Sequence, residues 1–216
     1  FCTVEMSSFY LDILKDRLYA YKADSKERRS AQTAMHEILM DLIVMLSPVL
    51  SFTMEEVWQF MKKPANAPES VQMLPWPEVK EEYINEELET KWDNFIEIRS
   101  EITKVLELAR RNKQIGHSLD AKVELHAEGE ALDILKSVEK DLATLLIVSQ
   151  ATLVEGVAGG TDATGREDLK VTVLPAEGHK CERCWIYSDE VGTDAEHPTL
   201  CKRCAEAVRK YLSLKH

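Results

Sequence analysis

The tail of the chain carries Cys181-Glu182-Arg183-Cys184 and, after 16 further residues, Cys201-Lys202-Arg203-Cys204. Two residues between the cysteines of each pair let both sulfur atoms point at one ion, and the intervening loop brings the second pair across. Four thiolates satisfy a tetrahedral Zn²⁺, and this spacing favours zinc over an iron–sulfur cluster or a redox pair. The sequence therefore predicts one structural zinc ion with no open coordination position for catalysis, and its ligands are Cys181, Cys184, Cys201 and Cys204.

Basic residues and one aromatic residue surround the four cysteines. They are Lys180, Arg183, Trp185, Lys202 and Arg203. Cations beside a ring suit a single-stranded nucleic acid, because phosphates meet the cations and a base stacks on the ring. The alternative is local: the cations offset the negative charge of a four-thiolate zinc centre, and Trp185 packs over it. The spacing alone leaves both interpretations open.

The composition is that of a globular protein with an acidic excess. The 216 residues allow one large domain or two small ones, 44% of them are hydrophobic, and the net charge is −11. This charge argues against attraction to polyanions through a global positive field, but it permits local basic patches. No apolar run is long enough for a membrane span, so we expect no membrane partner. Five cysteines without a secretory signal indicate a reducing, cytoplasmic location, and Phe1 in place of an initiator methionine suggests a fragment.

The first 63 residues predict only helices, in a mainly α fold. Apolar residues recur at helical spacing from Leu11 to Tyr21 and again from Ala31 to Leu46. Thr53-x-x-Glu56 has the pattern of a capping box, which predicts a third, short helix that begins there and ends at about Lys62.

The rest of the chain predicts a strap, one long helix and a small α+β unit before the cysteines. Residues 64–78 contain four prolines, and helical apolar spacing then runs from Ile84 to Ala109. Alternating polarity predicts strands at Ala121–His126, Lys170–Leu174 and, more weakly, Thr152–Val157. Further helices are predicted at Glu130–Ser137 and Lys140–Ile147, and the glycine-rich residues 159–165 predict a hairpin connection.

Charge is distributed unevenly along the chain. Residues 78–101 contain nine acidic and three basic residues, whereas residues 104–122 contain five basic and two acidic ones. Residues 15–29 contain six basic and three acidic residues. The basic end of the long helix suits the helix macrodipole, and nucleic-acid contact is the alternative interpretation.

Several segments together resemble bacterial isoleucyl-tRNA synthetase. Phe9–Tyr19 and Leu46–Trp58 are similar to its anticodon-binding helical bundle, and Ser70-Val71 with Trp76-Pro77 is similar to the strap that follows. Ile115–Val123 resembles the junction after the long helix, and Lys180–Trp185 with Leu200–Cys204 resembles the C-terminal zinc finger. The resemblance extends over essentially the whole chain and implies the C-terminal part of that enzyme.

The same resemblance implies that this part is not catalytic alone. The family's His-Ile-Gly-His type motif has only a near miss at Ile115-Gly116-His117, and Met61-Lys62-Lys63-Pro64 does not match its Lys-Met-Ser-Lys-Ser type loop. The parent enzyme joins isoleucine to its tRNA with ATP and Mg²⁺, which belong to the missing catalytic domain of the same polypeptide. This part would be a monomer in itself and would hold the anticodon stem-loop.

The resemblance also implies domain boundaries and RNA contacts. Residues 1–78 would be the bundle with its strap, 79–120 the connecting helix, 121–177 the α+β junction domain and 178–216 the zinc finger. We expect tRNA contacts from Lys15, Arg17, Arg28 and Arg29 in the bundle and from Lys180, Arg183, Trp185, Lys202 and Arg203 in the finger. Each bundle cation has an alternative role as an ion-pair partner on a helix surface.

Two other functions are compatible with these residues. A zinc-dependent adaptor would bind a protein and would be insensitive to RNA competitors. A finger like that of base-excision glycosylases would prefer duplex DNA. A thiol redox module needs one exposed, reactive Cys-x-x-Cys, and two equivalent pairs at metal spacing argue against it.

Overall fold

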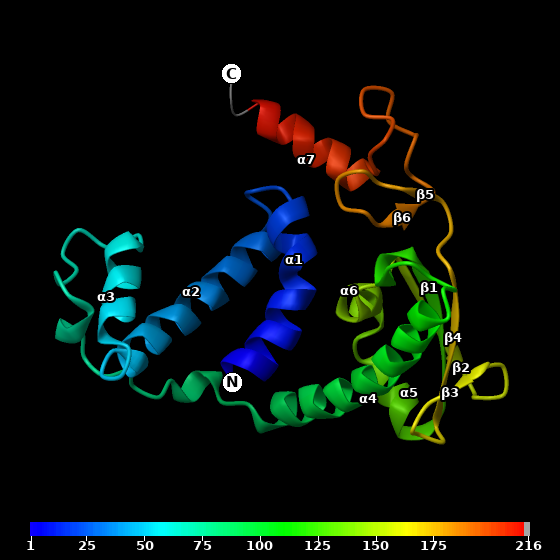
Figure 1. The fold of residues 1–216 in the computed structure, drawn as a ribbon, viewed down its shortest axis with the longest axis horizontal. Helices are drawn as coiled ribbons and strands as arrows, with labels where there is room; N and C mark the ends of the chain where they lie inside the picture. The colour runs from blue at the N-terminus through cyan, green and yellow to red at the C-terminus, as the bar shows by residue number, and fades with distance from the viewer. Residues whose placement is uncertain (214–216) are drawn as a thin grey trace. The chain divides into compact units, whose positions relative to one another are not determined.

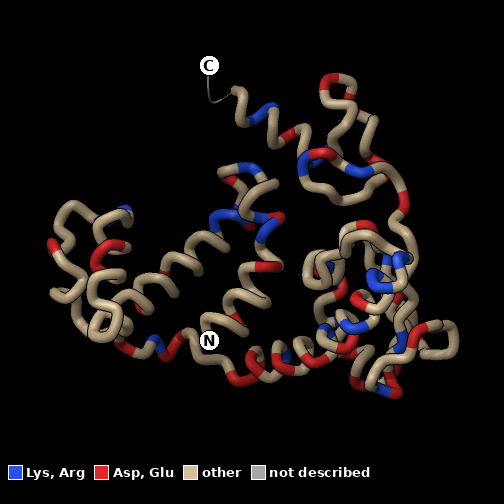
Figure 2. Tube along the Cα trace, viewed as in Figure 1, with Lys and Arg blue, Asp and Glu red and all other residues tan. Residues whose placement is uncertain are grey.

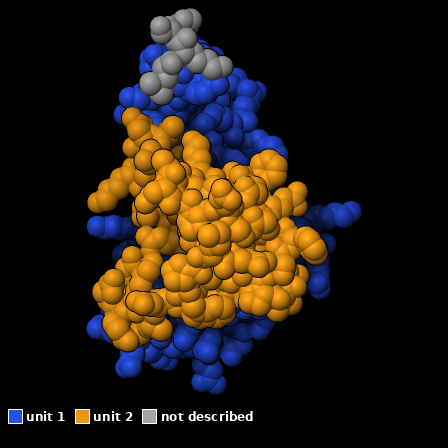
Figure 3. Space-filling view, turned by 90° about the vertical axis from the view of Figure 1, so that its left-hand side faces the viewer, with its two compact units in different colours: residues 1–22, 85–216 blue, residues 23–84 orange. Residues whose placement is uncertain are grey.

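A computed structural model describes residues 1–213, which fold into helices, two small sheets and a C-terminal finger (Figure 1). The chain divides into two compact units (Figure 3). Unit 1 comprises residues 1–22 together with those from 85 to the end of the described chain, and unit 2 comprises residues 23–84. Among the described residues, no helix combines the length and apolarity needed to cross a membrane.

Unit 2 is a pair of helices closed by the proline-rich strap. Helix α2 spans Lys26–Leu46 and begins where the Ser25 side chain accepts a hydrogen bond from the Arg28 amide, 3.2 Å away. Helix α3 spans Ser51–Phe60, and the two helices bury a common core. That core consists of Ile43, Val44, Met54, Trp58 and Val71. The apolar spacing of this region therefore marks packing, as helical periodicity usually does.

Polar contacts fasten the strap to α3. The Trp58 indole donates to the Pro68 carbonyl at 3.1 Å, and the Glu55 carboxylate accepts from the Ser70 hydroxyl at 2.7 Å and from the Val71 amide at 3.1 Å. A 3₁₀ turn, η2 (Val71–Met73), then inserts the fully buried Val71 into the core. The strap is therefore a packed part of unit 2.

The predicted start of the third helix is wrong. Helix α3 begins at Ser51, and its N-cap, Leu50, makes no side-chain capping bond, so Thr53 lies inside the first turn. The reason is the turn after α2, in which the Leu50 amide bonds the Leu46 carbonyl at 2.8 Å and the Met54 amide bonds the Leu50 carbonyl at 2.9 Å. Because the backbone is already helical at Thr53, the Thr-x-x-Glu pattern has no free N-terminus to cap.

The long predicted helix is confirmed as α4, Glu86–Arg111. Asn85 caps it by accepting from the Leu88 amide at 2.9 Å, and acidic residues fill its first turn while Arg110 and Arg111 fill its last. This polarity complements the helix macrodipole (Figure 2). The apolar face is buried throughout, through Phe95, Ile98, Ile102, Val105, Leu106 and Ala109.

Residues 1–22 pack with α4 and the finger and belong to unit 1, although the sequence grouped them with the rest of the bundle. Cys2–Tyr10 forms a π-helix, η1, that runs into helix α1, Leu11–Ala20. The ring of Phe9 lies 6.1 Å from that of Trp92 on α4, and the Arg99 guanidinium lies 5.2 Å from the Phe9 ring. Aromatic and cation–π packing of this kind explains why the segment joins α4.

A four-stranded sheet forms the α+β part of unit 1, in the order β2-β1-β4-β3. Strand β1 (Ala121–Ala127) pairs in parallel with β2 (Gln150–Glu155) and antiparallel with β4 (Leu169–Pro175). All three correspond to predicted strands. Alternate residues of β1 and β4 are buried against the helices, as the alternating sequence pattern requires.

Two short helices connect β1 to β2, and a loop connects β2 to β4. The helices are α5 (Gly129–Lys136) and α6 (Leu142–Leu146), with a 3₁₀ turn, η5 (Glu139–Asp141), between them. The loop at 159–165 is not a simple hairpin, because β1 separates β2 from β4 in the sheet. Instead, its residues Asp162–Ala163 form a short edge strand, β3, that pairs with β4.

Replacing a residue on the buried face of α4 tests this core. Ile102→Ala removes a fully buried side chain, so we expect the free energy of unfolding to fall by about 2–5 kcal/mol. Leu108→Ala on the same helix is the matched control, because Leu108 is 53% exposed and its loss should cost about 0.5 kcal/mol or less. Urea titration measures the free energy of unfolding of both variants. Equal losses would contradict the assignment of Ile102 to the buried face of α4.

Candidate functional site

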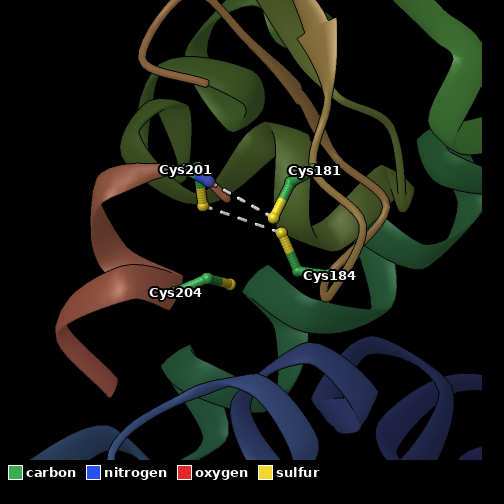
Figure 4. Close-up of side chains that lie close together, drawn as sticks. All are labelled: Cys181, Cys184, Cys201 and Cys204. Carbon is green, nitrogen blue, oxygen red and sulfur yellow. Dashed lines mark hydrogen bonds between the residues drawn. The ribbon is translucent and has the colours of Figure 1, made fainter. Parts of the chain in front are cut away.

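The four tail cysteines come together at the base of the finger (Figure 4). Cys181 and Cys184 lie in the turn between β5 (His179–Lys180) and β6 (Tyr187–Ser188), whereas Cys201 and Cys204 lie at the start of α7 (Lys202–Ser213). All four sulfur atoms lie within 4.8 Å of one another, and those of Cys184 and Cys201 are 3.9 Å apart. The spacing in the sequence therefore did identify one cluster.

The donor set fits a tetrahedral metal ion. Ligands at about 2.3 Å from zinc have sulfur–sulfur separations of about 3.8 Å, close to the 3.9 Å between Cys184 and Cys201. A hydrogen bond with Cys204 and burial raise the pKa of the Cys184 thiol, and burial raises that of Cys201. These sulfurs would therefore resist ionisation together unless a cation compensates their charge. With four thiolates bound, no position is left for a reacting water.

The first knuckle, Cys181–Trp185, leaves its tryptophan ring outside. The Trp185 amide donates to the Cys181 carbonyl at 2.8 Å, and the Cys201 amide donates to the Cys181 sulfur at 3.3 Å. Trp185 has a φ of 65°, in the left-handed region where glycine is the least strained residue, and it is 58% exposed. Because a large residue is strained in this conformation, the exposed ring suggests a function other than forming the turn. The ring is not buried against the cysteines.

Lys180 lies beside this exposed ring. Its ammonium group is 5.9 Å from the Trp185 ring centroid, 5.5 Å from the Tyr187 ring centroid and 3.2 Å from the Asp120 carboxylate. The contact combines a cation with two aromatic rings at the surface of the finger.

Cys201–Cys204 forms the second knuckle of the finger. The arginine of each knuckle contacts α1. Arg183 donates to the carbonyls of Ala20 and Tyr19 at 2.5 and 3.1 Å. Arg203 donates to both carboxylate oxygens of Asp16 at 2.5 and 2.8 Å. A guanidinium group has five N–H donors, so these contacts leave each arginine with donors for another ligand.

A cavity of about 640 Å³ lies within unit 1, between α1, α4, α6 and the first knuckle. Four of the predicted RNA-contact residues line it: Lys15, Arg183, Trp185 and Arg203. Arg99 and His117 also line the cavity, and neither was among the predicted contact residues. Arg99 lies in an acidic stretch of α4 and had no local signal, whereas His117 lies in the junction segment Ile115–Val123 but was given no role of its own.

The other predicted contact residues are not among the residues that line this cavity. Lys15 itself pairs with Asp12 in its own helix at 2.6 Å, and Arg17 pairs with Asp141 at 3.3 Å. Lys202 is exposed at the start of α7. Arg28 and Arg29 lie in the first turns of α2, in unit 2. Figure 2 shows basic residues at the start of α2.

Two segments of the chain match known protein families. Residues 1–125 match the anticodon-binding domain of tRNA ligase. The chain belongs to this family of tRNA-ligase domains. Residues 178–207 match a zinc finger found in FPG and IleRS, which agrees with the cysteine cluster. The helices α1, α2, α3 and α4 all lie within the range that matches the anticodon-binding domain.

Relatives similar to this chain are isoleucine–tRNA ligases. The one from Desulforamulus reducens is 50% identical over 213 residues, which are 98% of this chain and 23% of the relative. The one from Caldanaerobacter subterraneus subsp. tengcongensis is 50% identical over 218 residues, 99% of this chain and 23% of the relative. The one from Syntrophotalea carbinolica is 52% identical over 205 residues, which are 94% of this chain and 22% of the relative. The chain thus spans less than a quarter of the length of these relatives.

The cysteine cluster makes a direct prediction about metal content. Protein purified without chelator should contain one zinc ion per chain by elemental analysis, and Cys184→Ser combined with Cys201→Ser should remove it because two ligands cannot hold the ion. Cys2→Ser is the matched control, since Cys2 is exposed and lies outside the cluster. Retention of zinc in the double variant would contradict the assigned ligands.

Proposed function

We propose that this chain is the C-terminal part of an isoleucine–tRNA ligase and that it binds the anticodon stem-loop of isoleucine tRNA. The observation that carries the proposal is the match of residues 1–125 to an anticodon-binding domain. The 50% identity to an isoleucine–tRNA ligase over 98% of the chain supports the choice of amino acid. One structural Zn²⁺, held by the four cysteines, completes the site.

The finger offers the chemistry that a single-stranded loop requires. An anticodon loop presents unstacked bases flanked by phosphates, and a ring with nearby cations can hold both. Trp185 provides an exposed ring for stacking, the Lys180 ammonium lies 5.9 Å from the centroid of that ring, and Lys202 is exposed one residue after Cys201. In this proposal the zinc supplies no reactive position, and the knuckle residues bind and orient the RNA.

The helical residues add affinity without base discrimination. Lys15 and Arg17 on α1 and Arg28 and Arg29 on α2 would meet phosphates, which set the register of the RNA. A net charge of −11 is compatible with this role because the acids are concentrated at residues 78–101. Contacts to phosphate depend on local positive charge, and they weaken as salt rises.

The rest of the parent enzyme supplies the reaction. We propose that the parent binds ATP and Mg²⁺ in the catalytic domain of the same polypeptide and that this chain positions the tRNA. The functional segments would be 1–78, 79–120, 121–177 and 178–216, and the whole would act as a cytoplasmic monomer.

The two rival functions have less support. The finger match alone does not separate a tRNA ligase from a glycosylase, because its family includes FPG as well as IleRS. The match over residues 1–125 does separate them, since it describes a tRNA-ligase domain. The same match also disfavours a protein-interaction adaptor.

A filter-binding comparison tests the proposed ligand. The chain should bind isoleucine tRNA more tightly than a noncognate tRNA at the same salt, and binding to both should weaken between about 50 and 200 mM salt. Duplex DNA and unrelated RNA serve as competitors. Equal affinity for both tRNAs, or a preference for duplex DNA, would contradict the proposal, and the second result would favour the glycosylase-type function.

The tryptophan ring provides the sharper test. Trp185→Ala should weaken binding of isoleucine tRNA by about 1–3 kcal/mol, largely independent of salt, because a stacking contact is lost. Arg28→Ala with Arg29→Ala should weaken cognate and noncognate binding alike and flatten the salt dependence. Trp76→Ala is the matched control, since Trp76 is exposed in unit 2 far along the chain from the finger. Unchanged binding in Trp185→Ala, with zinc retained, would limit Trp185 to a structural role.

The absence of both nucleotide motifs from the sequence predicts that the chain is not catalytic alone. Isoleucine-dependent exchange of pyrophosphate into ATP should not exceed the buffer control, whereas a complete isoleucine–tRNA ligase assayed in parallel should catalyse it. Measurable exchange by the purified 216-residue chain, removed by immunodepletion, would overturn this prediction.

A further inference from the structure

Each cysteine pair carries one arginine between its two cysteines, and both arginines reach the same turn of α1. Arg183 lies between Cys181 and Cys184, and Arg203 lies between Cys201 and Cys204. Their partners on α1 are Asp16, Tyr19 and Ala20. The two halves of the cysteine cluster are therefore each joined to α1 by a separate set of hydrogen bonds.

Arg183 caps the C-terminus of α1. The last four carbonyls of a helix have no partner within the helix, and the negative end of the macrodipole lies there. The Arg183 guanidinium donates to two of these carbonyls, those of Tyr19 and Ala20. Arg183 thus satisfies the last carbonyls of α1, as a C-terminal capping motif does in other helices. The helix ends there, with Tyr21 in an extended conformation.

Arg203, in the second knuckle, binds the same turn of α1. Its fork meets the Asp16 carboxylate with two hydrogen bonds, a geometry that only arginine provides. The guanidinium also lies 4.7 Å from the centroid of the Tyr21 ring. Both side chains of the ion pair are largely covered, with exposed fractions of 30% for Arg203 and 24% for Asp16.

Apolar packing and a further ion pair extend the contact. The Ala20 side chain belongs to the same buried cluster as Cys181, Cys201 and Cys204. Lys22, two residues later, pairs with Glu206 on α7 at 2.7 Å. The end of α1 is therefore part of the core of the finger.

We propose that the metal centre sets the conformation of residues 16–21, and that the Asp16–Arg203 pair in turn retains the metal. Arg183 and Arg203 belong to different knuckles, so both can reach α1 only while the four sulfur ligands hold the two knuckles together. Coupling of this kind is reciprocal: whatever metal binding contributes to the order of α1, the order of α1 contributes to metal binding. The inference rests on the proposed zinc site and does not depend on RNA.

The coupling gives Asp16 a positioning role in the proposed RNA site. Asp16, Tyr19 and Ala20 line the same cavity as Trp185. Metal loss would therefore release the knuckle wall and the α1 wall of this cavity together. The sequence predicted that the knuckle arginines meet RNA or offset the charge of the four thiolates, and it gave no role to Asp16.

The experiment compares two aspartates on one helix, in the 216-residue chain. Asp16→Asn removes the charge that Arg203 meets, whereas Asp12→Asn, the control, removes a carboxylate that pairs with Lys15 within α1. Zinc transfer from each protein to excess chromogenic chelator gives a rate of metal loss. We expect Asp16→Asn to lose zinc about three- to tenfold faster than the unchanged chain, and Asp12→Asn to stay within about twofold, because only the first weakens a charge-assisted hydrogen bond to the knuckle.

Hydrogen exchange of the unchanged chain provides a second readout that needs no variant. Chelation of the metal should increase exchange at residues 17–21, while the buried centre of α4 keeps its protection. Equal zinc-loss rates in the two variants, or exchange at residues 17–21 that ignores the metal, would overturn the coupling and leave the zinc site intact. Failure of the unchanged chain to bind zinc would overturn the zinc site and the coupling together.

Discussion

Four sulfur atoms crowded within 4.8 Å of one another are the constraint on which the finger depends. The finger has little else to hold it, because its buried cluster consists of three cysteines and Ala20 of α1, with a few partly buried residues packed around them. A metal ion held by the four sulfur atoms would supply the folding free energy that so small an apolar core lacks. The loops between the cysteines are then free to present Trp185 and the basic residues without also having to form a core.

The basic residues of the finger differ in how far the fold itself uses them. Arg183 and Arg203 were predicted to meet RNA, and in the structure both also contact α1. Lys180 and Trp185 are different, since Lys180 pairs with Asp120 and lies beside the Trp185 ring, which is itself mostly exposed. A substitution of either arginine would therefore disturb the fold and any bound RNA together, whereas Trp185 separates the two effects.

Local patterns in the sequence predicted what local chemistry determines. Cysteine spacing identified the four-sulfur cluster, apolar periodicity identified α4, and alternation identified β1 and β4. The same reasoning misplaced the start of α3, because the turn after Leu46 had already made Thr53 helical. It also could not see that β1 lies between β2 and β4, or that Asp16 meets Arg203 187 positions away. Pairings across such separations follow from tertiary packing, for which a single sequence carries no local signal.

The closure of unit 1 from both ends of the chain has a consequence for synthesis on the ribosome. Residues 23–84 are contiguous, so unit 2 can fold as soon as it emerges, whereas Asp16 waits for Arg203, 187 positions later. At about 5–20 residues per second, that delay is about 10–40 seconds. During this interval the end of α1 has neither its arginine cap nor its apolar cover. Folding at the end of α1 therefore depends on the later synthesis of the segment that carries Arg183 and Arg203.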